Sequence, residues 1–152
     1  MLMEPKLEFA FEVRVEIAQE YRIGRSVDEV LGFTPITGGT AAGPMFNGKV
    51  LPGGGDWWVN RGDTAQLDAR YLLQADDGAV IDILNRGYFR AEPAILKRLE
   101  AGEIVPEEEY YYRTAPVFQT DAPAHKWMAE HQFLGFARDD KGVVCIRFFV
   151  VR

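Results

Sequence analysis

Apolar and polar residues alternate along much of the chain with a period of two, the pattern of a half-buried β-strand. The clearest case is residues 7–17, LEFAFEVRVEI, in which every second side chain is apolar from Leu7 to Ile17. Further strands are predicted between turns rich in Gly, Pro or Asp, at residues 34–40, 45–51, 57–60, 65–75, 79–88, 110–119, 131–138 and 142–151. This regular spacing predicts an antiparallel meander.

One segment has the pattern of a helix instead, EPAILKRLEAGE at residues 92–103. Pro93 fits the first helical position, Leu96 and Leu99 share a face, and Gly102 is placed to end the helix. A single helix among so many strands excludes a fold of alternating βαβ units.

Several predicted strands have apolar side chains on both faces, so both faces need a cover. In residues 65–75, Leu67, Ala69, Tyr71 and Leu73 alternate with Asp68, Arg70, Leu72 and Gln74. A sheet that closes on itself covers one face with its own interior. The sequence therefore predicts one all-β domain over residues 1–152, an antiparallel closed or nearly closed β-barrel with one short helix. A barrel of about eight strands can hold one small ligand.

The hairpin between residues 65–75 and 79–88 can form in two registers around the Asp-Gly turn at residues 77–78. A two-residue loop places Arg70 opposite Asn85. A three-residue loop with a bulge instead brings Asp82 and Arg86 onto the face of Arg70. The first register is favoured because it gives the second strand the more buriable face, but the pattern alone allows both.

The charge and cysteine content narrow the range of partners. A net charge of −6 repels nucleic acid and anionic membrane surfaces, so a small-molecule ligand is expected, with no nucleic acid and no membrane. Cys145 has no partner for a disulfide or a cysteine-based metal cluster, which fits a reducing cytoplasm. The first residues carry acids where a signal peptide needs an apolar run, so the expected location is cytoplasmic.

The segment GKVLPGGGDWWVNRGD at residues 48–63 places three glycines beside two tryptophans. A phosphate-binding loop is disfavoured, because no P-loop lysine and no helix follow and because Asp56 would repel a phosphate. A plain turn and a close approach of the backbone to a ligand both remain possible. Strand alternation sends Trp57 and Trp58 to opposite faces, so one is expected to face the cavity and the other the outside.

Five stretches of the chain resemble the DUF3237 family: PITGGTAAGP (35–44), GKVLPGGGDW (48–57), LDARYLLQADDGAVIDILNRG (67–87), EYYYRTAPVFQT (109–120), and Trp127 followed by FLG (133–135). The resemblance implies a small antiparallel β-barrel, commonly dimeric, with no generally established reaction. The family usually reads Trp-Leu-Asn where this chain has Trp127-Met128-Ala129, so a polar side chain of the family is missing here.

Four polar side chains are the candidate catalytic group. Asp68 and Arg70 share one strand face, as do Tyr111 and Arg113, and the four could converge inside a barrel. An Asp–Arg network that only fixes the barrel register is the equally weighted alternative. The candidate substrate contacts are Asp56, Trp57, Asn85, Arg86, Trp127 and Phe133.

Other types of site find little support. His125 and His131 match no common zinc spacing, so no metal is expected, and the only serine, Ser26, lacks a nucleophile motif. No strand–GxGxxG–helix unit exists, which excludes nicotinamide and flavin sites of that type, and no cofactor is expected. Cys145 lies in an apolar strand and is interpreted as an inert core thiol.

The first functional hypothesis is a cofactor-independent isomerase or cyclase that acts on an apolar oxygenated molecule, such as a phenolic or polyketide-like enone. Asp68 would serve as acid or base, the arginines would hold an enolate oxygen, and Tyr111 would donate a proton. The alternative is a non-catalytic barrel that binds such a ligand.

A homodimer is also predicted, from the closing strand at residues 142–151. Both faces of this strand are apolar except at Arg147, and only one face can line the barrel. A second subunit related by a twofold axis is the simplest cover for the other face.

Overall fold

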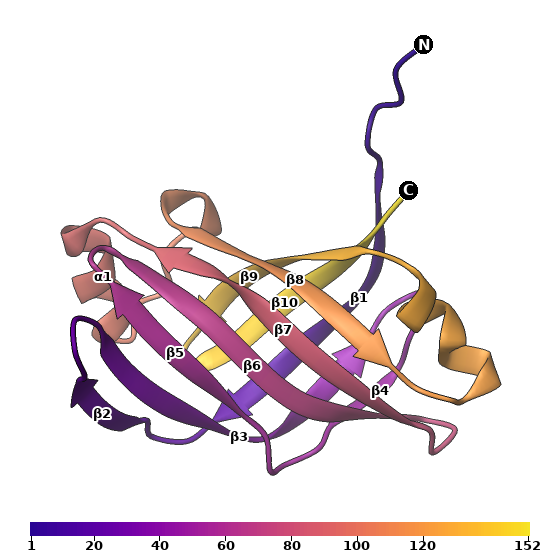
Figure 1. Cartoon of the computed structure of the whole chain (residues 1–152), viewed down its shortest axis with the longest axis horizontal. Coiled ribbons are helices and arrows are strands. Elements are labelled where there is room, and N and C mark those ends of the chain that lie inside the picture. Colours follow the sequence, from indigo (N-terminus) through magenta and orange to yellow (C-terminus); the bar gives the residue numbers. More distant parts are fainter.

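The computed structural model describes all 152 residues, and its strands form one closed antiparallel barrel (Figure 1). The strands are β1 (Leu7–Ile17), β2 (Tyr21–Arg25), β3 (Val30–Ala42), β4 (Gly48–Val50), β5 (Gly55–Arg61), β6 (Thr64–Ala75), β7 (Val80–Arg90), β8 (Tyr111–Gln119), β9 (Phe133–Asp140) and β10 (Val143–Val151). The helical elements are α1 (Pro93–Glu100) and two 3₁₀ segments, η1 (Glu107–Glu109) and η2 (Pro123–Glu130).

The barrel closes where β1 pairs with β10 along one edge and with β3 along the other. From β10 the order runs through β9, β8, β7 and β6 to β4 and β3. β5, like β4, pairs with β3 on one side and with β6 on the other. β2 pairs with the first part of β3. The prediction of a closed antiparallel barrel is confirmed, and β2 is an addition that the sequence pattern did not reveal.

The helical elements lie at the two ends of the barrel (Figure 1). α1 begins at Pro93, as predicted, and lies at the same end as β2, whereas η2 lies at the opposite end. Gly102, with φ of +81°, follows α1. None of the helices has the length and apolar character that crossing a bilayer requires.

The hairpin between β6 and β7 adopts the register that the sequence analysis did not favour. Asp68 pairs with Arg86 and Gln74 with Val80, which leaves a three-residue loop at 76–78. The prediction of a two-residue loop is wrong because local hydrogen bonding stabilises the three-residue loop. The Ala79 amide donates to the Asp77 carboxylate at 2.9 Å. Asp68, Arg70, Asp82 and Arg86 consequently share one face, and that face is outside the barrel.

The end of the barrel near η2 is filled by aromatic side chains. The ring of Phe118 lies 5.9 Å from that of Phe11, 4.9 Å from that of Phe133 and 5.8 Å from that of Phe148, and all four side chains are buried. Met128 of η2 is fully buried against this cluster. We call this end, closed by η2 and filled by the phenylalanines, the closed half.

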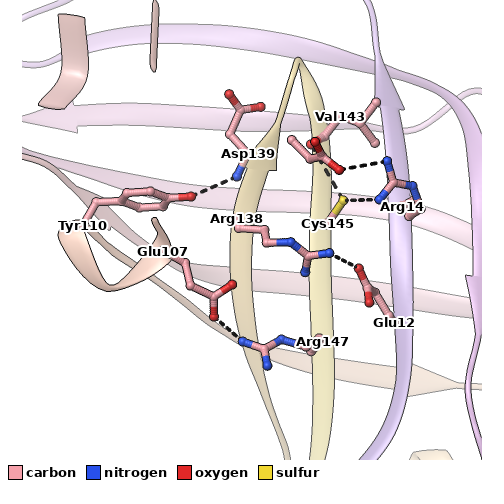
Figure 2. Close-up of polar contacts among 10 residues, drawn as sticks. Glu12, Arg14, Glu107, Tyr110, Arg138, Asp139, Val143, Cys145 and Arg147 are labelled. Carbon is pink, nitrogen blue, oxygen red and sulfur yellow. Dashed lines mark hydrogen bonds and ion pairs between the residues drawn. The ribbon is translucent and has the colours of Figure 1, made fainter. Parts of the chain in front are cut away.

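A polar network covers part of the outer face of β10 (Figure 2). Arg14 of β1 donates to the Cys145 sulfur at 3.1 Å, and Arg138 of β9 donates to Glu12 at 2.7 Å. Arg147 pairs with Glu107 of η1. Burial raises the pKa of the Cys145 thiol. The expectation that this face of residues 142–151 is bare is therefore wrong over this part of the strand.

Candidate functional site

The half of the barrel interior away from η2 contains a cavity of about 160 Å³. Most of its lining is apolar and comes from β1, β3, β6 and β10, including Val15, Ile36, Leu67 and Ile146. Six side chains with polar groups also line it. Thr34 lies toward the outside, and we call the other five the polar cluster: Asp56, Tyr71, Asn85, Tyr112 and Thr114. We call this end of the barrel the open half.

Strand alternation places the polar cluster inside. Leu67, Ala69 and Tyr71 point inward from β6, so the intervening Asp68 and Arg70 point outward. Inward positions recur at every second residue of β7, namely Ile81, Ile83 and Asn85, and of β8, namely Tyr112, Thr114, Pro116 and Phe118.

Asp56 is the only carboxylic acid that lines the cavity. The amide of Asp68 donates to its Oδ1 at 2.8 Å, at a point where the β5–β6 pairing is interrupted between residues 56 and 59. The Asp56 side chain thus takes the place of a backbone carbonyl as hydrogen-bond acceptor between β5 and β6. Desolvation raises the pKa of Asp56 to about 6, and the nearby Asp68 charge acts in the same direction while the amide bond opposes it. A carboxyl with such a pKa can release or take up a proton near neutrality.

Two tyrosines in the cavity remain protonated at physiological pH. Burial raises the pKa of Tyr71 and of Tyr112 well above the usual value, and the Asp56 charge adds to the effect in both. Each phenol is therefore a neutral hydrogen-bond donor close enough to Asp56 to be affected by its charge.

Three atoms of the polar cluster are buried without a hydrogen-bond partner: Tyr71 Oη, Asn85 Oδ1 and Thr114 Oγ1. An unsatisfied buried polar atom costs about 1–3 kcal/mol, so three in one cavity call for an explanation. Their residues, on β6, β7 and β8, line the same apolar space as Asp56. This arrangement suits a molecule that carries polar atoms into the cavity.

A cleft of about 630 Å³ continues outward from the cavity. Both are lined by Thr34, Leu67, Tyr112 and Val144, which we call the neck. Leu96 and Leu99 of α1 form part of the outer wall, together with Trp58. The cavity is therefore reached from the α1 end of the barrel.

The glycines at 53–55 serve the strand arrangement rather than a ligand. Gly53 has φ of +112° and ends a turn, which favours the turn interpretation. A Cβ on Gly54 would lie 2.4 Å from the Arg70 carbonyl oxygen, and one on Gly55 would lie 2.2 Å from the ring of Phe33. The close approach that these glycines permit is to neighbouring protein atoms, not to the cavity.

The four candidate catalytic residues do not meet inside the barrel, and that expectation is wrong in its geometry. Asp68 lies 3.0 Å from Arg86, and Arg70 lies 3.2 Å from Asp82, both pairs on the outer face of β6 and β7. Tyr111 and Arg113 also point outward, with the Arg113 guanidinium 5.6 Å from the Tyr111 ring centre. The inward row on β6 leaves Asp68 and Arg70 outside, and the inward Tyr112 and Thr114 of β8 leave Tyr111 and Arg113 outside.

The candidate substrate contacts divide between cavity, surface and core. Asp56 and Asn85 line the cavity, whereas Arg86 is paired with Asp68 outside. Trp57 is 57% exposed and packs on Phe33, while Trp58 faces inward and donates to the Thr34 hydroxyl at 3.2 Å. The two indoles do lie on opposite faces, with Trp58 rather than Trp57 inside, but Trp58 lines the outer cleft and not the cavity.

Trp127 and Phe133 lie in the closed half, with ring centres 5.8 Å apart, and do not reach the cavity. Ala129, at the position where the family usually has Asn, is exposed on η2. Sequence reasoning missed Tyr71, Tyr112 and Thr114. The inward row of residues 67, 69, 71 and 73 could have found Tyr71, and the inward row of residues 112, 114, 116 and 118 could have found the other two.

The histidines have structural partners. His125 Nε2 lies 2.7 Å from Asp77 Oδ2, which ties η2 to the β6–β7 loop, and a ring nitrogen of His131 lies 2.7 Å from the Trp127 carbonyl oxygen. The structure contains no group of three or more His, Cys, Asp or Glu side chains arranged to hold a metal ion.

The chain matches the family model described as a protein of unknown function, DUF3237, over residues 5–151. A UPF0311 protein of Clostridium acetobutylicum is 35% identical over 154 residues, covering 99% of this chain and 96% of the relative. A crystal structure of a Rhodopseudomonas palustris protein of unknown function superposes with a TM-score of 0.91 at 30% identity over the whole of both chains.

A shorter match joins this chain to a protein of Penicillium herquei that is named as a hydroalkoxylation enzyme. The two are 38% identical over 79 residues, which is 51% of this chain and 52% of the fungal protein. The family model and the bacterial relatives, by contrast, extend over nearly all of the sequence. On this evidence the chain belongs to the DUF3237 family.

Proposed function

We propose that the protein is a cofactor-independent enzyme that isomerises or cyclises a small oxygenated molecule by proton transfer in the barrel cavity. The observation that carries the proposal is Asp56, a desolvated carboxyl with a pKa of about 6 among buried polar atoms that lack partners. Perturbed carboxyls in cavities are typical of acid–base sites. Asp56 takes the role that sequence analysis gave to Asp68.

In an isomerisation, the Asp56 carboxylate removes a proton from the carbon next to a carbonyl or conjugated with it. The C–H electron pair moves into the conjugated system, and the carbonyl becomes an enolate. Tyr71 or Tyr112 donates a hydrogen bond to the enolate oxygen, which stabilises the developing charge. Protonated Asp56 then returns the proton to another carbon, so no co-reactant is consumed.

In a cyclisation, protonated Asp56 donates its proton to a C=C bond of the substrate. A hydroxyl oxygen of the same molecule forms a C–O bond to the electron-poor carbon, and the hydroxyl proton passes to the Asp56 carboxylate. The net change is addition of O–H across the double bond. The partial likeness to a protein named as a hydroalkoxylation enzyme supports this second form of the proposal.

Proton exchange tests the proposal without knowledge of the natural substrate. A panel of enolisable ring ketones is incubated in D₂O with wild type, Asp56→Asn and Asp82→Asn, and loss of the exchangeable C–H signals is followed by NMR. Asp82 is the matched control, because it is an acid on the outer face paired with Arg70. We expect exchange with wild type and Asp82→Asn, and a decrease of about 10²-fold or more with Asp56→Asn.

Equal exchange rates for wild type and Asp56→Asn would overturn the role of Asp56. Saturable binding of ketones without exchange by wild type would replace the enzyme with the non-catalytic binding barrel. Neither binding nor exchange across the panel would overturn both versions of the function.

We also propose that the protein forms a homodimer through its outer face. Apolar side chains remain exposed on neighbouring strands there, including Leu72 at 42%, Val117 at 51% and Trp57 at 57%. Contiguous exposed apolar surface is typical of interfaces. Sedimentation should give about 34 kDa, twice the 17.2 kDa of one chain, and a stable species of one chain's mass would overturn the dimer.

A cytoplasmic location is part of the same proposal. The lone, unpaired Cys145 supports it, since reduced thiols persist in that compartment. Fractionation of source cells checks it, and recovery of the protein outside the cytoplasmic fraction would contradict it.

A further inference from the structure

We propose that the cavity receives a single six-membered ring bearing a neutral hydroxyl or carbonyl. The rest of the molecule extends through the neck into the outer cleft, and anionic rings are rejected. This inference rests on the proposed function, since it names the class of substrate for the same site. Size, polar lining, charge and the route of access each support it.

The size of the cavity fits one ring. Its volume is about 160 Å³. An apolar protein cavity of about 150 Å³ accommodates benzene, so a single six-membered ring fills this space. Fused rings exceed it. The apolar lining from Val15, Ile36, Leu67 and Ile146 surrounds the space on several sides and suits the faces of such a ring.

Polar residues line the space that the ring would fill. The Asp56 carboxyl and the unpartnered oxygens of Tyr71, Asn85 and Thr114 come from four successive strands, β5 to β8. A ring hydroxyl can donate to the carboxylate or the Asn85 oxygen and accept from a phenol. A ring carbonyl accepts from Tyr71 or Thr114. A hydrocarbon ring would leave all of these atoms unsatisfied, which disfavours it.

The charge of the cavity selects neutral molecules. No Lys, Arg or His side chain lines it, whereas Asp56 becomes negative as the pH rises past about 6. A carboxylate or phenolate would bring a second negative charge into a desolvated space without a cation. Protonated phenols and ketones avoid this repulsion.

The outer cleft also disfavours anionic groups. Its charged lining consists of one cation, Arg22, and four acids, Glu20, Asp63, Glu100 and Asp139. A neutral or cationic substituent is therefore favoured where the molecule emerges past the neck. The neck contains Leu67 and Val144, so the part of the molecule that passes through it is expected to be apolar.

Calorimetry with a matched set of probes tests the inference at pH 8. The probes are phenol, cyclohex-2-enone, benzoate and the open-chain hexan-2-one, each titrated into wild type, Asp56→Asn and Asp82→Asn. We expect phenol and cyclohex-2-enone to bind wild type and Asp82→Asn at least about tenfold more tightly than benzoate or hexan-2-one. In Asp56→Asn, the preference for phenol over benzoate should shrink, because the repelling charge is gone, but it should not vanish, because the cavity still has no cation.

A second pair of variants locates the bound ring. Leu67→Trp places an indole in the neck and should abolish phenol binding, whereas Leu72→Trp, on the outer face of the same strand, should leave it unchanged. Matched melting curves for the two variants show whether Leu67→Trp is folded. Phenol binding that persists in a folded Leu67→Trp would overturn the placement of the ring.

Two results would overturn the substrate class. Benzoate binding wild type as tightly as phenol would contradict the selection of neutral rings, and hexan-2-one matching cyclohex-2-enone would contradict the ring. In either case proton exchange that depends on Asp56 would leave the proposed function standing. Loss of that dependence, with ring binding intact, would instead overturn the proposed function alone.

Discussion

The two halves of the barrel interior are built by the same strands and differ in what fills them. In the closed half, four phenylalanines and Met128 occupy the inward positions with no exposed surface or very little. In the open half, the inward positions hold Ala69 of β6, Asn85 of β7 and Thr114 of β8, and a cavity remains. The difference lies in side-chain size and polarity, not in the wall.

Strand β8 shows the change along one chain segment. Its inward side chains run from Tyr112 and Thr114 in the open half to Phe118 in the closed half. Close packing is the ordinary state of a protein interior, so a half that leaves polar atoms without partners is less stable than it could be. Such a departure from optimal packing is typical of functional sites. The closed half therefore stabilises the fold, and the open half is available for a ligand.

The largest expected effect concerns the closed half. Phe118→Ala removes a fully enclosed ring that contacts three other phenylalanines, and it should lower the free energy of unfolding by about 3–5 kcal/mol. Urea denaturation measures this. A loss of less than about 1 kcal/mol would mean that the closed half does not carry the stability assigned to it.

Asp56→Asn should have the opposite effect at neutral pH and raise the free energy of unfolding. The folded pKa of Asp56, about 6, lies above its ordinary value of 3.8, so the folded state binds the proton more tightly than the unfolded state. Stability contributed by this group is therefore present at low pH and decreases as the pH rises from about 4 to about 6. At pH 8 the ionised carboxyl costs about 3 kcal/mol, which Asn removes.

The control for this prediction is pH itself. At pH 4, Asp56 is protonated in the folded state, and the stabilisation by Asn should largely vanish. Denaturation of wild type and Asp56→Asn at both pH values measures the difference. An Asp56→Asn variant less stable than wild type at pH 8 would mean that the carboxylate is satisfied in the free protein.

Thr114→Val should produce a smaller stabilisation. The Thr114 hydroxyl is buried without a partner, and replacing it with a methyl group of similar shape should add about 1 kcal/mol to the free energy of unfolding. Thr120→Val is the matched control, because that hydroxyl donates to the Val80 carbonyl at 3.0 Å and accepts from the Ala122 amide at 3.2 Å. The control should lose stability. Loss of stability in both variants would place Thr114 in the packed part of the interior.

The smallest effect is expected for Asp68→Asn, on the outside of the open half. Its exposed pair with Arg86 contributes about 0–1 kcal/mol, so stability should hardly change. The negative charge of Asp68 does help to raise the pKa of Asp56, and the variant should lower that pKa slightly. Denaturation and NMR titration measure the two effects. Abolished proton exchange in this variant would return the catalytic role to Asp68.

The barrel was predictable because period-two alternation is strong in β1 and because turn residues separate most strands. The faces of individual strands were less predictable. On β6, Asp68 and Arg70 attracted attention as reactive groups, but the competing row of Leu67, Ala69 and Tyr71 is the more apolar one. Since a shift of one residue exchanges the two faces, choosing the reactive row placed the whole site outside.

The register at the β6–β7 loop was not predictable from the strands, because it depends on the bond between the Asp77 carboxylate and the Ala79 amide. The environment of Asp56 depends on contacts distant in sequence. Its desolvation requires the complete barrel, and its amide partner belongs to Asp68 on the next strand. Sequence analysis could nominate Asp56 for binding, but its raised pKa follows only from the assembled cavity.

The pKa of Asp56 is the most direct measure of the difference between the two halves. Carbon-detected NMR of ¹³C-labelled protein follows the Asp56 carboxyl resonance from pH 3 to pH 9, with its absence in Asp56→Asn giving the assignment. The account predicts a midpoint of about 6. A midpoint near the ordinary value of 3.8 would show that the carboxyl is solvated, and would contradict the desolvated acid–base site.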